Sequence, residues 1–366
     1  MGTLRTIFAL SVVFAHSWPD GMLFVGSQNA VELFYIISGF LISYILVESR
    51  SYGSVSTFYI NRYLRLYPIY IVVAALSLIA VLVLKQPQFM AVYRQAPIDA
   101  IGLLVISNLL MFGQDWVMFS GVAHGQLVFS SDFQLSEVLL YRGLLVPQAW
   151  TLGVELSFYL IAPFVLPRRR LIYSLLLASI ALRACLIHSG LGTRDPWTYR
   201  FFPAELSLFL VGVLAHQILR PLYAKILKRG EALISGAATC FLIALALVYF
   251  LIPLIEPYRA LILFVAFVSL LPLAFIFQGR NRFDMWIGNL SYPIYIGHLL
   301  MTGAAAHVSR AMGMGNLRII SIASAALSVA FAILLNYGIG MPFEKVRNYV
   351  KLRQFDANQR PVPAVS

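Results

Sequence analysis

Long, continuously apolar runs separated by short polar segments dominate the pattern along this chain. A hydrocarbon core of ~30 Å needs roughly 20 mostly apolar residues per helical span, and most of the runs have about that length. Because the runs are unbroken rather than alternating, they predict helices and exclude the strands of a membrane barrel. We expect ten spans, near residues 4–24, 29–47, 66–84, 148–166, 171–187, 201–219, 233–252, 259–277, 286–304 and 319–340.

A further apolar stretch at 98–113 is shorter than a full span and leads into a polar segment at 114–147. If 98–113 crossed the membrane, the basic run 168–170 would fall outside the cell, against the usual retention of Lys and Arg on the cytoplasmic side. A re-entrant or interfacial segment is therefore predicted here. The expected fold is an all-α polytopic membrane protein with about ten transmembrane helices plus this segment.

Composition supports the same fold class, because 60% of the residues are hydrophobic and only 11% are charged. One soluble core could not bury that much apolar side chain, so a lipid-facing surface is required. The two cysteines, Cys185 and Cys240, lie far apart in apolar stretches. We expect both cysteines to be small buried hydrophobic residues that form no disulfide or metal framework.

The net charge of +12 could indicate a nucleic-acid partner, but its distribution follows membrane topology. With both termini cytoplasmic, about two thirds of the 27 Lys and Arg residues face the cytoplasm, including those in 48–65, 168–170 and 220–229. We expect a multi-pass protein of the cell (inner) membrane and no nucleic-acid partner. Residues 1–344 form the predicted membrane-embedded domain, and 345–366 a short solvated cytoplasmic tail.

The first span carries two ionisable side chains, Arg5 and His16. A charge at the centre of a membrane helix costs roughly 2.5 to 3.5 kcal/mol, so we expect each of these residues to have a structural or functional role. Their spacing of 11 positions places both on one helix face, about 16 Å apart along the axis. That suits a substrate whose anionic head is bound by Arg5 and whose reactive end reaches His16, a residue fitted to act as a general base. A structural histidine packed between helices is the alternative.

Arg62 and Arg65 lie in a predicted cytoplasmic loop, three residues apart and so on one face. Guanidinium groups bind phosphate in a bidentate manner, although the same residues could be topology anchors only.

Two carboxylates extend this set of candidates. Glu32, at the start of the second span, could hold the imidazole of His16 in one tautomer, or could be solvated at the interface. Glu155, within an apolar span, needs an arginine or a water-filled cavity as partner. Ser38 with Gly39 could form a nucleophile turn, but a glycine at a helix contact is the commoner explanation. Weaker membrane-embedded candidates are Arg183, Glu205, His216 and His298.

Together these pieces resemble the acyltransferase-3 family of integral-membrane O-acyltransferases. The matching elements are Arg5 and His16 with ten residues between them, 31–42 (VELFYIISGFLI), Arg62 and Arg65 before Leu66-Tyr67-Pro68, 150–155 (WTLGVE), 287–298 (IGNLSYPIYIGH) and 341–344 (MPFE). The resemblance spans residues 5 to 344. There are two departures from the family pattern. The stretch before Arg5 is short, and Glu32 stands where the family commonly carries an acidic residue, often aspartate.

The resemblance implies transfer of an acyl group, usually acetyl from acetyl-CoA, to a hydroxyl of an envelope glycan or glycolipid within the bilayer. It implies His16 as the catalytic histidine, either as general base or as acyl carrier, with Glu32 and Glu155 completing the catalytic set. Arg5, Arg62 and Arg65 are expected to bind the acyl-CoA phosphates, and no metal is expected. The alternative function is a secondary transporter of an anionic or lipid-linked sugar, for which the chain shows no inverted repeat.

Overall fold

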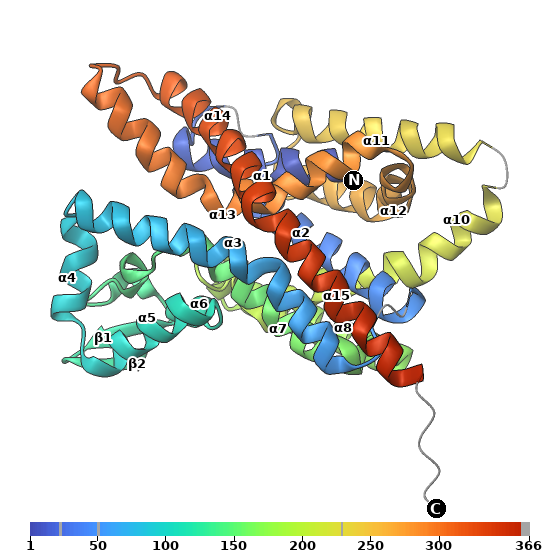
Figure 1. Cartoon of the computed structure of the whole chain (residues 1–366), viewed down its shortest axis with the longest axis horizontal. Helices are drawn as coiled ribbons and strands as arrows, with labels where there is room; N and C mark the ends of the chain where they lie inside the picture. The colour runs from blue at the N-terminus through green and yellow to red at the C-terminus, as the bar shows by residue number, and fades with distance from the viewer. Residues whose placement is uncertain (22–23, 50–51, 228–229, 360–366) are drawn as a thin grey trace, which may run out of the picture.

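The computed structural model describes residues 1–21, 24–49, 52–227 and 230–359, with side chains up to Lys351, and these residues are almost entirely helical (Figure 1). This confirms the all-α fold class. The α-helices are α1 (Gly2–Ser17), α2 (Ser27–Ser43), α3 (Val55–Val83), α4 (Pro87–Gln95), α5 (Ile98–Leu110), α6 (Gln114–Val117), α7 (Trp150–Val165), α8 (Arg169–His188), α9 (Phe202–Leu214), α10 (Arg220–Ile226), α11 (Glu231–Val248), α12 (Tyr258–Arg280), α13 (Arg282–Ala311), α14 (Leu317–Leu335) and α15 (Met341–Gln359).

Several short elements connect or extend these helices. Three π-helical turns continue helices α2, α9 and α14, and they are η1 (Tyr44–Glu48), η6 (Ala215–Leu219) and η8 (Asn336–Gly340). The 3-10 turns are η2 (Phe133–Leu135), η3 (Leu140–Gly143), η4 (Pro147–Ala149), η5 (Leu191–Thr193) and η7 (Tyr249–Leu251). Strands β1 (Ser120–Ala123) and β2 (Gln126–Phe129) pair antiparallel, with Ser120 opposite Phe129.

Seven described helical runs are long and apolar enough to cross a membrane. They are Ser27–Glu48, Val55–Val83, Arg169–His188, Phe202–Ile226, Glu231–Leu251, Tyr258–Arg280 and Leu317–Lys351. The predicted count of ten is therefore not confirmed, although a helix covers most of each predicted span. The helices α1 and α7 have only 16 residues each. Helix α1 packs against α2, α11, α13 and α14, so protein rather than lipid surrounds much of it. A helix enclosed in this way does not have to match the full thickness of the hydrocarbon core.

Helix α3 begins earlier than the apolar pattern predicts. Ser54 caps it by accepting a hydrogen bond from the backbone N–H of Thr57, a contact that stabilises a helix N-terminus. Arg62 and Arg65 consequently lie on α3, and their expected position in a loop is wrong. Conversely, α1 ends at Ser17, so the predicted first span was too long; of its residues, 22–23 lie outside the described part of the chain.

Helices α2 and α9 cross at two glycines. A Cβ atom added to Gly39 would lie 1.9 Å from the carbonyl oxygen of Phe209, and one added to Gly212 would lie 2.0 Å from that of Ile36. Only glycine permits this approach of two backbones. The interpretation of Gly39 as a helix contact is therefore confirmed.

The segment between α3 and α7 forms a separate small layer at one side of the helices (Figure 1). It holds α4, α5, α6 and the β1–β2 hairpin. Helix α5 has 13 residues and exposes Ile98 and Ile106, which are 83% and 58% exposed. Its length and apolar face suit the predicted re-entrant or interfacial segment, which stays a prediction.

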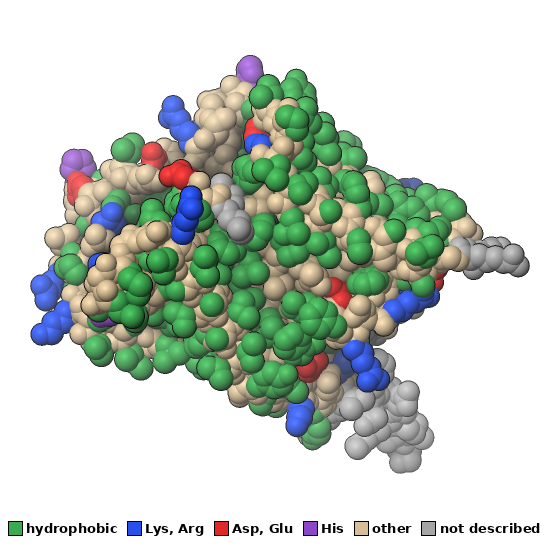
Figure 2. All heavy atoms as spheres, turned by 90° about the horizontal axis from the view of Figure 1, so that it is seen from above, with side chains coloured by type: hydrophobic (Ala, Val, Ile, Leu, Met, Phe, Trp, Pro, Cys, Tyr) green, Lys and Arg blue, Asp and Glu red, His purple; other side chains and the backbone are tan. Residues whose placement is uncertain are grey.

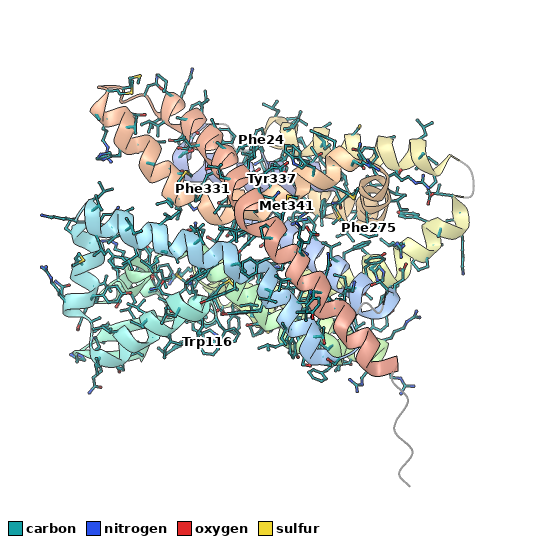
Figure 3. The ribbon with its side chains drawn as sticks, viewed as in Figure 1. Phe24, Trp116, Phe275, Phe331, Tyr337 and Met341 are labelled. Atoms are coloured by element: carbon teal, nitrogen blue, oxygen red, sulfur yellow. The ribbon has the colours of Figure 1, made fainter. Side chains whose placement is uncertain are left out.

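The C-terminal helices form one long run across the molecule. Phe331, Tyr337 and Met341 follow one another along α14, η8 and α15 in Figure 3, and α15 packs against α3. Much of the predicted solvated tail is thus a helix bound to the domain. The predicted boundary at 344 is untested, and residues 360–366 of the tail lie outside the described residues, as do 50–51 and 228–229 of the predicted cytoplasmic segments.

The surface fits a lipid environment. In Figure 2 hydrophobic side chains cover the middle of the visible face, whereas Lys and Arg gather nearer its edges. Cys185 and Cys240 are free and exposed, so the expectation that they are buried is wrong. Multiple long apolar helices with an apolar outer face define a multi-pass membrane protein.

Candidate active site

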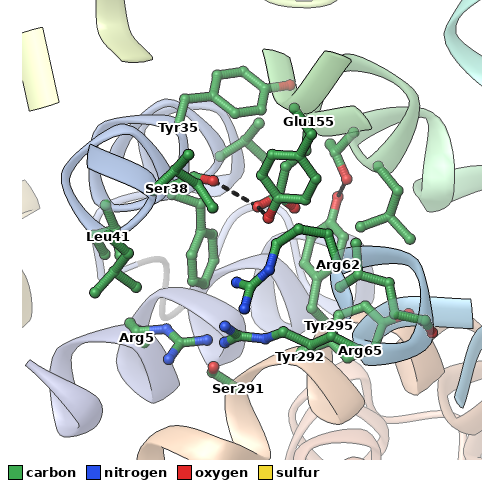
Figure 4. Close-up of a pocket in the computed structure, with 18 residues that line it drawn as sticks. Arg5, Tyr35, Ser38, Leu41, Arg62, Arg65, Glu155, Ser291, Tyr292 and Tyr295 are labelled. Atoms are coloured by element: carbon green, nitrogen blue, oxygen red, sulfur yellow. Dashed lines mark hydrogen bonds between the residues drawn. The ribbon is translucent and has the colours of Figure 1, made fainter. Parts of the chain in front are cut away.

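Three arginines from two helices converge in one cavity, here named the arginine cavity. It measures about 100 Å³, and Arg5 from α1 with Arg62 and Arg65 from α3 line it. Figure 4 shows their guanidinium groups turned toward one another across the cavity. No carboxylate lies within 4.0 Å of these three groups among the described residues. The cavity therefore carries concentrated positive charge that an anionic ligand would neutralise.

Glu155 of α7 is the carboxylate of this cavity. Its Oε1 accepts a hydrogen bond from Ser38 Oγ at 2.6 Å, drawn as a dashed line in Figure 4, and another from the hydroxyl of Tyr159. The sequence predicted that Glu155 would need an arginine or a water-filled cavity as its partner. The structure places it in the same cavity as all three arginines, held by two hydroxyl groups.

A second cavity, here named the histidine cavity, measures about 280 Å³, near the lower end of small-molecule sites. It is lined by His16 and includes the aromatic side chains of Trp150 and Tyr199. Val31 and Tyr295 line both cavities. Arg5 and His16 therefore reach two adjoining cavities from one helix, as their spacing on a common face predicts.

The hydrogen bond of His16 fixes which ring nitrogen is free. Nδ1 lies 2.8 Å from the carbonyl oxygen of Val12, one turn earlier on α1. A carbonyl can only accept, so Nδ1 carries the proton in the neutral ring and Nε2 keeps its lone pair. The side chain is exposed to the histidine cavity. This is the arrangement a general base or an acyl-accepting nitrogen requires.

The lining of the histidine cavity also includes an arginine held between aromatic rings. The guanidinium of Arg200 lies 4.3 Å from the ring centroid of Trp150 and 5.0 Å from that of Tyr199. Asp195 binds it in a bidentate manner, at 2.5 Å to Nε and 2.9 Å to Nη2. Sequence reasoning missed Arg200 and Asp195, because they lie in an irregular loop. Trp150 was noted only as part of the 150–155 element.

Glu32 has a different partner from the one considered for it. Its Oε1 accepts hydrogen bonds from Arg183 at 2.9 Å and Gln28 at 3.4 Å. Arg183 also contacts Glu205 at 3.1 Å and the carbonyl of Thr198 at 3.3 Å. The tautomer of His16 is thus set by a backbone carbonyl, and a catalytic role for Glu32 stays a prediction. The Arg183 cluster instead anchors the loop that carries Tyr199 and Arg200.

Of the two remaining histidine candidates, His298 contacts the site and His216 does not. His298 of α13 lies beside His16, with ring centroids 4.9 Å apart. His216 bonds Ser43 and Glu48 at 2.9 and 3.0 Å and lines neither cavity. His298 also lines neither cavity, but it contacts His16 and therefore belongs to the candidate site, whereas His216 does not.

Comparison with known proteins identifies the family. A family model described as an acyltransferase domain, that of the acyltransferase-3 family, matches residues 2–337. The chain belongs to this family and is a membrane acyltransferase. A similar curated protein is the peptidoglycan O-acetyltransferase OatA of Listeria monocytogenes, 26% identical over 329 residues. The match covers 81% of this chain and 48% of the relative, so the chain spans about half the length of that protein. No solved structure matches this chain significantly.

Proposed function

We propose that this protein is a membrane O-acyltransferase that moves an acyl group from cytoplasmic acyl-CoA to a hydroxyl group of an envelope glycan or glycolipid. Acetyl is the acyl group that we propose to test first. The observation that carries the proposal is the pair of adjoining cavities. One is strongly cationic and the other presents the free Nε2 of His16, and Val31 and Tyr295 line both.

The donor enters the arginine cavity in this account. Acyl-CoA carries phosphates at one end and the thioester at the other, which matches the placing of Arg5 and His16 on one helix. Arg5, Arg62 and Arg65 bind the diphosphate through charge-assisted hydrogen bonds. The acyl thioester then extends past Val31 and Tyr295 toward His16. The N-terminal end of α3 faces the cytoplasm in this arrangement.

The acceptor occupies the histidine cavity. Its aromatic rings suit the apolar faces of a sugar. For hydroxyl groups, Gln148 offers Oε1 as an acceptor and Arg200 offers N–H donors. That the relative OatA is named a peptidoglycan O-acetyltransferase supports a glycan acceptor.

His16 carries the chemistry. Its Nε2 takes the proton of the acceptor hydroxyl while the oxygen attacks the thioester carbonyl. The C–S bond breaks, an ester forms, and the proton on His16 passes to the departing thiolate, which leaves as free CoA. Alternatively, Nε2 first attacks the thioester carbonyl and expels the CoA thiolate. The acceptor hydroxyl then attacks the acyl group on Nε2, its proton passes to the thiolate, and the ester forms as the C–N bond breaks. Both routes use the same nitrogen and have the same products.

The experiment is thiol release from acetyl-CoA by the purified protein in liposomes, with and without N-acetylglucosamine oligosaccharides. Enzyme-dependent release of CoA, with labelled acetyl appearing on the oligosaccharide, is expected. A transporter is the competing function, because two adjoining cavities also suit a transport path. Uptake of labelled oligosaccharide into the liposomes without thiol release would favour the transporter.

A further inference from the structure

The C-terminal helix α15 brings two further cations toward the arginines of α3. Arg347 donates from Nε and Nη2 to Asn61 Oδ1 at 3.2 and 3.1 Å, and Asn61 Nδ2 donates to the carbonyl of Arg347 at 3.2 Å. Lys351 places its Nζ 5.7 Å from the ring centroid of Tyr52. Arg62 donates to the hydroxyl of Tyr52 at 2.8 Å, so it belongs both to this network and to the arginine cavity.

This network has more donors than its acceptors can satisfy. Asn61 Oδ1 receives hydrogen bonds from Tyr52, Arg62 and Arg347, although an amide oxygen has only two lone pairs. In the part of the chain that the structure describes, no carboxylate lies within 4.0 Å of Arg62, Arg347 or Lys351. Three cations gathered around neutral partners, with donors to spare, indicate a site for an anion with several oxygens.

The position of the network identifies which anion fits. Asn61 lies one helical turn before Arg65 on α3, about 6 Å along the axis toward the N-terminal end. The network therefore continues the arginine cavity toward the side by which acyl-CoA enters in the proposed reaction. The family model ends at residue 337, before Arg347 and Lys351, so the family match assigns them nothing.

The phosphate groups of coenzyme A follow one another in the same order as the cationic groups of this protein. Its thioester arm is followed by a diphosphate, and beyond this the ribose carries a separate phosphate at the 3′ position. With the thioester at His16 and the diphosphate at Arg5, Arg62 and Arg65, the ribose phosphate lies farthest from the reaction. We propose that Arg347, assisted by Lys351, binds the 3′-phosphate of acyl-CoA. This inference rests on the proposed acyl-CoA donor.

The test compares acetyl-CoA with 3′-dephospho-acetyl-CoA as ligands of the full chain in phosphatidylcholine nanodiscs. Arg347→Gln keeps an amide N–H for Asn61 but removes the charge. We expect it to weaken acetyl-CoA about ten- to a hundred-fold, the loss typical of a charged hydrogen bond, and to leave the dephospho ligand unchanged. Lys351→Gln, which removes the cation that lies near the ring of Tyr52, should act in the same direction. Lys345→Gln, an exposed charge on the same helix, is the matched control.

Equal weakening of both ligands by Arg347→Gln, with Lys351→Gln silent, would overturn the subsite and leave acyl-CoA binding intact. Unchanged donor binding together with lost affinity for soluble dioctanoyl phosphatidylglycerol would show a lipid-headgroup site and also overturn it. Wild-type protein that binds neither acetyl-CoA nor its dephospho form would instead contradict the proposed donor itself.

Discussion

The imidazole rings of His16 and His298 lie side by side, with their planes inclined by 56° and their centroids 4.9 Å apart. His298 Nδ1 lies 2.6 Å from the carbonyl of Tyr295, so Nδ1 holds the proton. Its Nε2 is buried and has no hydrogen-bond partner within the described residues. A second lone pair therefore stands next to the proposed base, where it would face positive charge once His16 is protonated.

We expect His298→Phe to lower the transfer rate at least tenfold while the KM for acetyl-CoA stays near that of the wild type. Phenylalanine keeps a ring in the buried site but cannot accept a hydrogen bond, so the protonated form of His16 loses stabilisation. His298→Gln restores an acceptor and should recover part of the rate. Steady-state kinetics of both variants check this, and a wild-type rate for His298→Phe would make His298 a packing residue only.

Arg65→Ala should weaken acetyl-CoA binding about ten- to a hundred-fold, because a charge-assisted phosphate contact is worth roughly 1.5 to 3 kcal/mol. Arg65→Lys should restore only part of the affinity, since lysine lacks the guanidinium fork. Calorimetric titration of each variant measures the effect. Arg169→Ala, an exposed cation at the start of α8, is the control and should bind as wild type. Unaltered binding by Arg65→Ala would leave Arg65 as a topology anchor.

Arg183→Met should destabilise the protein far more than Glu32→Gln. Arg183 bridges Glu32 and Glu205, which are both buried, and its loss leaves two carboxylates without a cation, at a cost of about 3 to 5 kcal/mol. Thermal unfolding in detergent measures the difference. Glu32→Gln also tests a catalytic role for Glu32, since retained acetyl transfer would exclude one.

Asp115 gives a pH dependence of stability. It is 4% exposed, its Oδ1 lies 2.2 Å from where a Cβ of Gly153 would stand, and burial raises its pKa to about 7. Between about pH 4 and 7 the unfolded chain has lost this proton while the folded protein keeps it, so stability falls as pH rises through that window. Asp115→Asn should flatten the fall, measured as the melting temperature against pH. If Asp115→Asn shows the same change of melting temperature with pH as the wild type, another group is responsible for the pH dependence.

Local pattern was sufficient for some features and not for others. Arg5 and His16 share a helix, so their spacing alone predicts how they divide between two ends of a site. The same holds for Arg62 and Arg65, although their place on α3 depends on the Ser54 cap, which a hydropathy pattern does not register. Glu155 was recognisable as a site candidate, because a carboxylate in an apolar span is costly unless it has a polar partner.

Contacts between distant segments could not be predicted in this way. Glu32 meets Arg183 across 151 positions, and Arg347 meets Asn61 across 286. The pairing of His298 with His16 likewise depends on how α13 packs against α1. Arg200 and Asp195 lie in a loop without periodicity, so no pattern pointed to these two residues. The predicted number of membrane crossings is not confirmed, because length and composition qualify only seven of the described helical runs, and enclosed helices such as α1 are shorter than a full span.

The central claim is that His16 performs the chemistry, and the most direct measurement is acetyl transferred per mole of enzyme by His16→Gln. Glutamine approximates the size of the imidazole and can still donate to the carbonyl of Val12, but it offers no basic nitrogen. We predict a loss of about 10² to 10⁴-fold in transfer with unchanged acetyl-CoA affinity, while His188→Gln, at an exposed histidine, matches wild type. Substantial transfer by a well-folded His16→Gln protein would contradict the account.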